Sequence, residues 1–311
     1  MPVKKYLITG VAGFIGSALA RYLLTSGYEV VGVDDLSTGF VSNVPDGCEF
    51  IRGDCADDTI ISNINASNIE AIFHLAGQSS GEISFSDPVK DIRANTVSTL
   101  LLLQFAEKNK IDKFIYASTM SVYGEPEEPN LAVRECDSVR PKSFYGVGKL
   151  ASEHYLKIYK DRGMQTFALR FFNVYGPGQN MENTRQGMVS IYLAHILSFS
   201  KVEVKGSKTR YRDFIYIDDV VEALIRCLTI NTDFNGVINI GTGIATTVEE
   251  LLDHIQSLYG KPIKLVFGQG TPGDIHGIHA DTTVMDEILG SWRKVELKSG
   301  LRLFLQALGQ N

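Results

Sequence analysis

The feature that most constrains the fold is a glycine-rich turn, Gly10-Val11-Ala12-Gly13-Phe14-Ile15-Gly16, between a strand-like and a helix-like segment. Gly10 allows a tight turn, Gly13 lets backbone N–H groups approach a pyrophosphate, and Gly16 lets helix and strand pack closely. Three glycines also occur in ordinary turns, so their spacing alone is weak evidence. Together with the flanking strand and helix, they predict the first unit of a dinucleotide-binding fold.

The first half of the chain alternates short β-branched runs with longer stretches of helical period. The expected strands are Tyr6–Thr9, Glu29–Asp34, Glu49–Arg52, Ala71–Leu75, Lys113–Ser118 and Gln165–Phe171. The expected helices between them are Phe14–Ser26, Pro88–Lys108 and Tyr145–Arg162. Because parallel strands need long crossovers, this order predicts an α/β protein with a doubly wound parallel sheet of the Rossmann type.

The alternation loosens after Asn173, where turn clusters lie at Gly176–Asn180 and Gly268–Gly273. Short strands are interleaved there with expected helices Met188–Ser198, Asp218–Leu228 and Val248–Leu258. We therefore expect a smaller, intertwined C-terminal lobe. The predicted dinucleotide-binding domain is 1–172 with a returning segment near 211–243, and the substrate-binding lobe is 173–210 with 244–311.

Composition narrows the class of protein. A net charge of −6 over 311 residues argues against broad binding to nucleic acid or to anionic membranes. No apolar run reaches the roughly 20 residues of a membrane helix, and the N-terminus lacks a signal-peptide pattern. We expect a cytoplasmic protein. The four cysteines form no C-x-x-C pair and indicate reduced, structural thiols, and no metal site is expected, even near His276 and His279.

Two acids follow the second and third predicted strands. Asp34 stands where a carboxylate can bind the adenosine ribose hydroxyls, and it would repel a 2′-phosphate, which favours NAD over NADP. Asp54 could accept a hydrogen bond from the adenine amine. The alternative is that both are solvated acids at strand ends.

Tyr145 and Lys149 are four residues apart at the start of a predicted helix and should share one face. The cations of Lys149 and of a nicotinamide would favour the phenolate, making Tyr145 a general base for a sugar hydroxyl. Ser118 and Thr119 end a predicted strand at the edge of the sheet where ligands bind, and can supply a hydroxyl to the reacting oxygen. The alternatives are a tyrosine packed under a lysine stem and an ordinary strand-end cap.

Several motifs together resemble the extended short-chain dehydrogenases/reductases, in the NAD-dependent nucleotide-sugar epimerase/dehydratase family, and most of all the UDP-glucose (UDP-galactose) 4-epimerases. The resemblance covers essentially the whole chain. It rests on Phe14–Gly16, Val33–Gly39, Phe73–Gln78, Asn95, Ser118–Gly124, Tyr145–Lys149, Arg170–Gly176, Arg212–Asp219, and Gly273-Asp274 followed by Ala280-Asp281.

The resemblance implies residue roles. Tyr145 would be the base, Lys149 would bind the nicotinamide ribose, and Thr119 would be the catalytic hydroxyl. The implied cofactor contacts are Gly10, Gly13, Phe14, Ile15, Gly16, Asp34, Asp35, Asp54, Cys55, Leu75, Ala76, Gly77, Asn95, Ser118, Tyr145, Lys149 and Phe172. The implied substrate contacts are Ser79, Thr119, Tyr145, Asn173, Met188, Val189, Arg212 and Asp274.

Two of these substrate contacts and one histidine outside both sets have a more specific expectation. Asn173 would hold the diphosphate region of the substrate. Arg212 would bind a phosphate, because a guanidinium fork matches phosphate oxygens, unless it is a surface ion pair with Asp213. His74 lies inside a predicted strand and is expected to be a core histidine rather than a catalytic group.

All these enzymes begin by oxidising C4 of the hexose. A dehydratase then needs an added acid and base directly after the catalytic threonine, where this chain has Met120 and Ser121. We therefore expect an isomerase that epimerises a nucleotide-diphosphate hexose, such as a UDP-hexose, at C4, with NAD regenerated in each cycle. The alternatives are 3,5-epimerisation, reduction, decarboxylation, or dehydration using acids such as Glu82 or Glu125, and a non-catalytic dinucleotide-binding protein.

The chain departs from the epimerase pattern at three places. Thr271 replaces a second phosphate-binding arginine, Ile278 stands where the room for a 2-N-acetyl group is set, and Gly77-Gln78-Ser79 replaces a lysine-bearing version. These leave the nucleotide and the sugar open. The resemblance also implies a homodimer through the helices Pro88–Lys108 and Tyr145–Arg162.

Overall fold

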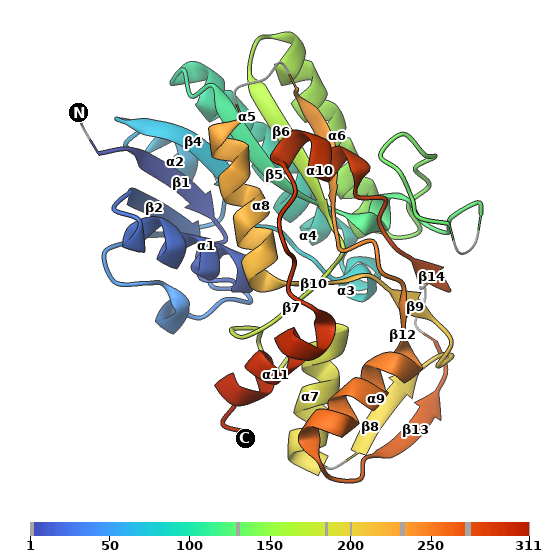
Figure 1. The fold of residues 1–311 in the computed structure, drawn as a ribbon. Coiled ribbons are helices and arrows are strands. Elements are labelled where there is room, and N and C mark those ends of the chain that lie inside the picture. The colour runs from blue at the N-terminus through green and yellow to red at the C-terminus, as the bar shows by residue number, and fades with distance from the viewer. Residues whose placement is uncertain are drawn as a thin grey trace.

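The computed structural model describes residues 3–128, 131–183, 186–199, 201–230, 234–270 and 275–310. Its centre is a seven-stranded parallel sheet (Figure 1). Across the sheet the strands are β11 (Gly236–Ile240), β6 (Gln165–Phe171), β5 (Lys113–Thr119), β4 (Ile69–His74), β1 (Lys5–Thr9), β2 (Glu29–Asp34) and β3 (Glu49–Arg52). The predicted fold class is confirmed, and all six predicted strands occur with ends shifted by no more than two residues.

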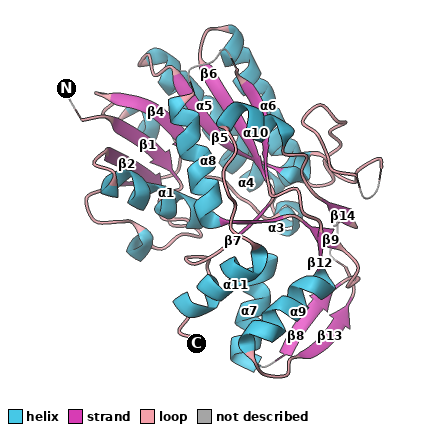
Figure 2. Cartoon of the chain, in the orientation of Figure 1, coloured by secondary structure: helices cyan, strands magenta, loops and turns pink. Residues whose placement is uncertain are grey.

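Helices cover both faces of this sheet (Figure 2). Neighbouring strand residues point to opposite faces, so Leu7 and Ile8 of β1 belong to two different core clusters. One cluster is covered by α1 and α8, and the other by α5 and α6. The helices of this part are α1 (Phe14–Thr25), α2 (Asp58–Ser62), α3 (Gly81–Ser86), α4 (Pro88–Ile92), α5 (Ser98–Lys108), α6 (Phe144–Asp161), α8 (Ile217–Thr229) and α10 (Thr283–Leu289), with short turns η1 (Val41–Asn43) and η3 (Met120–Val122).

The predicted helix Pro88–Lys108 is interrupted. It consists of α4, a π-helical turn η2 (Arg93–Val97), and α5. A π-turn inserts one extra residue into the helical repeat, and such turns often occur at functional sites. Here the turn carries the buried Asn95, whose amide donates to the carbonyl of Gln78, 2.9 Å away.

The smaller lobe is built from β7 (Asn173–Tyr175), α7 (Met188–Phe199), β8 (Lys201–Lys205), β9 (Tyr211–Arg212), β10 (Phe214–Tyr216), β12 (Thr246–Thr247), α9 (Val248–Tyr259), β13 (Lys264–Gly268), β14 (Gly277–Ile278) and α11 (Leu297–Ala307). Between its parts the chain returns to the large sheet through α8 and β11 (Figure 1). Leu193 of α7, Val202 of β8 and Leu251 of α9 share one core cluster with Leu19 of α1. The core of the lobe is therefore continuous with the core on the α1 and α8 side of the sheet.

Candidate active site

The glycine turn closes the space between β1, β4 and α1. Gly10 has φ +74°, and a Cβ on it would lie 2.8 Å from the backbone nitrogen of Ala76. A Cβ on Gly16 would overlap the carbonyl oxygen of Gly10. No side chain therefore fits at either position, and the first turn of α1 comes directly to the strand ends, as pyrophosphate binding at a helix N-terminus requires.

Asp34 organises the neighbouring loop. Its carboxylate accepts hydrogen bonds from the backbone N–H groups of Ala12, at 2.9 Å, and Leu36, at 2.8 Å. Burial raises the pKa of Asp34, and these two hydrogen bonds act in the opposite direction. The side chain of Asn43 also donates to the carbonyl of Ala12, at 3.0 Å. The carboxylate thus ties the end of β2 to the glycine turn.

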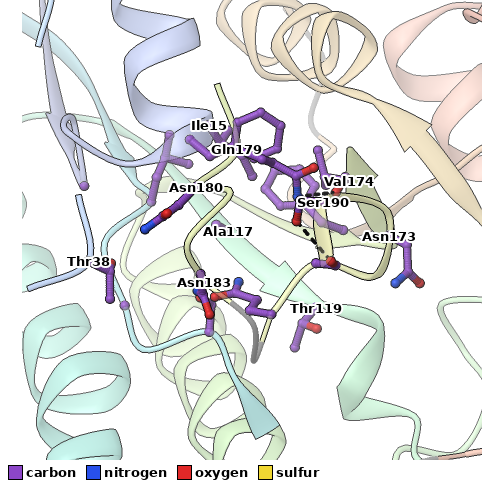
Figure 3. A pocket seen from close by; sticks show the side chains of 18 of the residues that line it. Ile15, Thr38, Ala117, Thr119, Asn173, Val174, Gln179, Asn180, Asn183 and Ser190 are labelled. Carbon is purple, nitrogen blue, oxygen red and sulfur yellow. Dashed lines mark hydrogen bonds between the residues drawn. The ribbon is translucent and has the colours of Figure 1, made fainter. Parts of the chain in front are cut away.

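A cavity of about 350 Å³ lies at the carboxyl ends of the central strands, beside this turn (Figure 3). Most of the predicted contacts line it. These are Gly10, Phe14, Ile15, Gly16, Leu75, Gly77, Ser79, Ser118, Thr119, Tyr145, Lys149, Phe172, Asn173, Met188 and Val189.

The other predicted contacts lie outside the wall of this cavity. They are Gly13, Asp34, Asp35, Asp54, Cys55, Ala76 and Asn95, whereas Arg212 lines an adjoining cavity. The N–H of Gly13 donates to the carbonyl of Gly10, 3.1 Å away. Asp54 is half exposed and forms an ion pair with Arg93, at 3.9 Å. Asp274 lies outside the described residues, as does Thr271.

The structure adds residues that the sequence reasoning did not assign to the site. Thr38, Gly39, Phe40 and Asn43 follow β2, and Gln179, Asn180, Asn183 and Gln186 follow β7, and all line the cavity (Figure 3). The sequence contains a signal for both groups of residues. Thr38 and Gly39 belong to the motif Val33–Gly39, and Gln179 and Asn180 to the turn cluster after Asn173, but neither was connected to a ligand.

Tyr145, Lys149 and Thr119 meet on one wall of the cavity. Ser143 begins α6 by accepting the N–H of Gly146 at 3.1 Å, which places Tyr145 and Lys149 one turn apart on the buried face of the helix. The Lys149 ammonium donates to the carbonyl of Ala117 at 2.9 Å and lies 5.9 Å from the centre of the Tyr145 ring. Tyr145 is only 8% exposed and Lys149 3%.

Burial controls the ionisation of this pair in the protein alone. It raises the pKa of Tyr145 to about 12, although a hydrogen bond with Thr119 favours the phenolate. It lowers the pKa of Lys149 to about 8, against the attraction of Asp91. The pKa of Tyr145 is therefore raised in the protein alone and not lowered as predicted, because burial and the charge of Asp91 both disfavour the phenolate and outweigh the hydrogen bond with Thr119.

A buried polar cluster supports the loop after β4. Asp91 accepts hydrogen bonds from the amides of Gln78, at 2.8 Å, and Asn95, at 3.2 Å. His74 is a satisfied core histidine, as predicted, with Thr9 at 2.7 Å and Thr99 at 3.1 Å.

A second cavity of about 340 Å³ continues from the first, and both are lined by Ser79, Met120, Ser121, Asn173 and Met188. The Arg212 guanidinium forms part of its wall and donates to the carbonyl of Ile275 at 3.0 Å. Asp213 points elsewhere. Its carboxylate accepts the N–H groups of Thr242, Gly243 and Ala280 at 2.8–3.1 Å, so the two neighbours are not arranged as a surface ion pair.

The sequence from Tyr6 to Gly241 matches the NAD dependent epimerase/dehydratase family. The chain belongs to this family. The UDP-glucose 4-epimerase of Thermotoga maritima, solved with UDP-glucose, is 34% identical, with 98% of each chain covered and a TM-score of 0.93. The UDP-glucose 4-epimerase of Thermus thermophilus, solved in complex with NAD, is 32% identical, with 98% of this chain and 99% of that chain covered and a TM-score of 0.90.

Family members catalyse more than one reaction. UDP-glucuronic acid decarboxylase 3 of Arabidopsis thaliana is 31% identical over 97% of this chain and 88% of its own length. This epimerase/dehydratase-family protein is an NAD-dependent enzyme that converts nucleotide sugars. Its own residues determine which of the family's reactions it catalyses.

The residues present fit NAD. The glycine turn excludes side chains where the pyrophosphate would lie, and Lys149 offers a buried cation in the wall of the same cavity. In the described part of the chain, the buried side-chain oxygens of Asn95 and Asn173 have no hydrogen-bond partner, and Asn173 lines the cavity. Such oxygens are costly to bury unless a ligand or water completes them.

Two further observations concern the described residues only. None of their helices is both long and apolar enough to cross a membrane. Nor do their histidine, cysteine and acidic side chains gather in a group of three that could hold a metal ion.

Proposed function

We propose that this enzyme epimerises a nucleotide-diphosphate hexose, a UDP-hexose in the first instance, at C4. The observation that carries the proposal is the wall beside the catalytic pair. Directly after Thr119 the cavity is lined by Met120 and Ser121, a thioether and a hydroxyl. Neither is suited to remove a C5 proton or to protonate a leaving C6 hydroxyl, whereas C4 oxidation and reduction need only a base and a hydride carrier.

Each catalytic residue has a defined task in this scheme. Tyr145 takes the proton of the C4 hydroxyl, and Thr119 hydrogen-bonds the same oxygen. Lys149 stabilises the phenolate by its charge, since Tyr145 is otherwise held as the neutral phenol. Bound NAD supplies the acceptor and donor of the C4 hydride. After the 4-keto sugar has rotated to present its other face, Tyr145 returns the proton to the C4 oxygen. The opposite configuration at C4 results.

The other residues that line the cavity are consistent with a nucleotide sugar as the substrate. Ser79, Met188 and Val189 line the same cavity as the catalytic pair, and so does Asn173, whose buried side-chain oxygen has no partner. We assign the diphosphate to the adjoining cavity beside Arg212. In this arrangement residues 1–172, with the return near 211–243, form the cofactor-binding domain, which also contributes Arg212 to the diphosphate site, and residues 173–210 and 244–311 form the substrate-binding lobe.

Two acids could supply dehydratase chemistry from other loops, and both have partners elsewhere. Glu82 lines the second cavity and pairs with Lys205 at 3.7 Å. Glu125 pairs with Lys142 at 3.1 Å and accepts the N–H of His276 at 3.2 Å. These contacts favour epimerisation, because an acid/base residue must reach the carbon beside the ketone.

Reaction in deuterated water tests the proposal. With UDP-glucose, UDP-N-acetylglucosamine and UDP-glucuronate as substrates and no added cofactor, pure 4-epimerisation leaves every carbon-bound position unlabelled. Dehydration or 3,5-epimerisation exchanges a proton beside the 4-keto group and places deuterium at C5 or C3. A deuterated 6-deoxy-4-keto sugar as the product contradicts the proposal, and so does a decarboxylated sugar.

We also propose that the enzyme is a homodimer formed through α6 and the helical segment Pro88–Lys108, which consists of α4, η2 and α5. Exposed apolar side chains gather on α3, α4 and α6, namely Phe85, Val89, Ile92, Phe144 and Val147. Val89→Asp should convert dimer to monomer in sedimentation-velocity experiments, because it places a charge in the buried interface. Val41→Asp is the matched control, since Val41 is similarly exposed but lies in η1. A monomeric wild-type enzyme contradicts the proposal.

A further inference from the structure

Asp91 is a fully buried carboxyl group outside the catalytic pair. It lies on α4 and is 0% exposed. Its Oδ1 accepts both of its hydrogen bonds, from the side-chain amides of Gln78 at 2.8 Å and Asn95 at 3.2 Å. Its Oδ2 is buried and has no hydrogen-bond partner among the described residues. A carboxylate is costly to bury unless hydrogen bonds or an opposite charge compensate it, so this oxygen points to a compensating charge nearby.

Two glycines bring Asp91 and Asn95 close to Lys149. A Cβ on Gly148, the residue before Lys149 on α6, would lie 3.3 Å from the Oδ2 of Asp91. A Cβ on Gly77 would overlap the Oδ1 of Asn95 and lie 3.2 Å from the Lys149 ammonium nitrogen. The unpartnered oxygen of Asp91 therefore lies against the turn of α6 that carries Lys149, and that of Asn95 lies near the ammonium group itself.

Lys149 is a buried cation that needs such a charge. Its ammonium group donates to the carbonyl of Ala117 at 2.9 Å and lies over the ring of Tyr116, 4.8 Å from the ring centre. A carbonyl and a ring face attract a cation but carry no net charge. A buried ammonium loses its proton readily unless an opposite charge lies nearby. Burial lowers the pKa of Lys149 to about 8, and the charge of Asp91 acts in the opposite direction.

The other described ionisable side chains around Lys149 do not balance it. Glu153, one turn further along α6, is held in its own ion pair with Arg170, at 2.7 Å. Tyr116 on β5 is kept as a neutral phenol, because burial raises its pKa. His74 on β4 is kept neutral, because burial and the charge of Lys149 lower its pKa.

The described charged groups near Asp91 on other elements are engaged elsewhere or exposed. Glu82 on α3 forms the ion pair described above, whereas Lys90 on α4 and Arg93 on η2 are exposed. Burial raises the pKa of Asp91, while its two hydrogen bonds and the charge of Lys149 act to lower it. The influence between Asp91 and Lys149 is therefore mutual, as expected for opposite charges in a poorly solvated region.

We propose that Asp91 is a positioning residue of the catalytic pair, whose buried carboxylate is the counter-charge that holds Lys149 as an ammonium ion. The inference rests on the proposed function only for its first step, in which Tyr145 takes the proton of the C4 hydroxyl. Lys149 can favour the phenolate only while it is charged. The negative charge of Asp91 also opposes the Tyr145 phenolate directly, so Asp91 acts on both members of the pair. The alternative is that Asp91 only ties α4 to the loop of Gln78.

Asp91→Asn isolates the charge, because both hydrogen bonds end on Oδ1. An asparagine in the same place keeps that oxygen as the acceptor and puts its amide nitrogen where the unpartnered Oδ2 lies. Without a negative charge nearby, each proton of the Tyr145–Lys149 pair is lost more easily, whichever residue it leaves. We therefore expect both apparent pKa values of the pair to fall by at least about half a pH unit.

Two measurements on the NAD-loaded enzyme test this. Titration of the tyrosinate absorbance, with a Tyr145→Phe variant of the same background subtracted, reports Tyr145 without any substrate. The first-turnover reduction of bound NAD by the three UDP-sugars, followed as NADH absorbance, gives a pH–rate profile. Its acid limb reports phenolate formation and its alkaline limb reports loss of the Lys149 ammonium. We expect Asp91→Asn to move the Tyr145 titration and both limbs to lower pH.

Asp87→Asn is the matched control. It makes the same substitution at the start of the same helix, where Asp87 is exposed and accepts the backbone N–H of Lys90 at 3.0 Å. Asparagine caps a helix about as well as aspartate, and an exposed charge is screened by solvent and salt. The titration and both limbs should therefore stay where they are in the wild type.

The outcomes separate this inference from the proposed function. If Asp91→Asn leaves the Tyr145 titration or either limb unmoved, Asp91 only ties its helix to the loop and the inference is wrong, even where the rate falls. It is also wrong if neither Asp91→Asn nor Asp91→Ser folds with NAD bound, since the role is then structural. If the Tyr145 titration moves to lower pH but no UDP-sugar reduces the bound NAD, the inference stands and the proposed function falls. If titration and limbs move but the product is not a 4-epimer, the inference again stands and the proposed reaction is overturned.

Discussion

Glu153→Gln should destabilise the enzyme strongly, because it leaves a buried cation without its counter-ion. Glu153 on α6 forms two hydrogen bonds with Arg170 on β6, at 2.9 and 2.7 Å, and accepts a third from Ser118 at 2.5 Å. Both charged side chains are about 5% exposed or less. The Arg170 guanidinium also lies over the ring of Tyr123, at 4.7 Å.

The expected loss follows from this geometry. Removing one partner of a buried ion pair costs about 3–5 kcal/mol in the free energy of unfolding. With an unfolding entropy of about 2.1 cal/mol/K per residue over 311 residues, this lowers Tm by about 5–8 °C. Glu249→Gln, which breaks the exposed pair with Lys208, should change the free energy of unfolding by less than about 1 kcal/mol.

A double-mutant cycle separates the pair from its surroundings. Glu153→Leu with Arg170→Met removes both charges and should cost less than either single change, because no unpaired buried charge remains. Thermal and urea unfolding of the NAD-loaded variants give the four free energies. The reasoning is refuted if Glu153→Gln loses less than about 1 kcal/mol, or if the double variant loses the sum of the two singles.

Three further predictions concern the site. Tyr145→Phe should retain bound NAD and lower kcat by about 10²-fold or more, as loss of a general base does, and a near-normal steady-state rate would place the base elsewhere. Lys149→Met removes a charge that favours the phenolate, so the pKa of Tyr145 rises and the acid limb of the pH–rate profile moves to higher pH; an unmoved limb would contradict this. The purified enzyme should release NAD(H) on denaturation, whereas release of NADP(H) would contradict the role given to Asp34.

The sheet could be predicted well because its signals are local. Strand β2 begins and ends where the sequence predicts, since a run of buried β-branched residues ends at a strand-end acid. The π-turn around Asn95 could not be predicted, because residues 88–108 keep an unbroken helical pattern. The π-turn depends on tertiary packing, in which the side-chain amide of Asn95 donates to the carbonyl of Gln78.

Thr119 ends β5, and Tyr145 and Lys149 lie at the start of α6, as the motifs predict, but the surroundings of these residues could not be predicted. Gln179, Asn180 and Asn183 lie on a loop whose sequence reads only as a turn, and their approach to the cofactor end of the cavity depends on how the lobe packs. The raised pKa of Tyr145 depends on its burial, which no spacing of residues reveals.

The continuous core beneath α1, α7, α8 and α9 also limits how this enzyme can change over evolutionary time. A lobe that the chain enters twice, and whose core is continuous with that beneath α1 and α8, cannot be exchanged as a cassette with a relative without breaking that packing. New substrate preferences must then arise by point changes in the loops after β2, β5 and β7 and before β9, which line the cavities without holding the core together. Directed evolution of the enzyme should accordingly yield altered sugar or nucleotide choice from those loops, while lobe-swapped chimeras fail to fold.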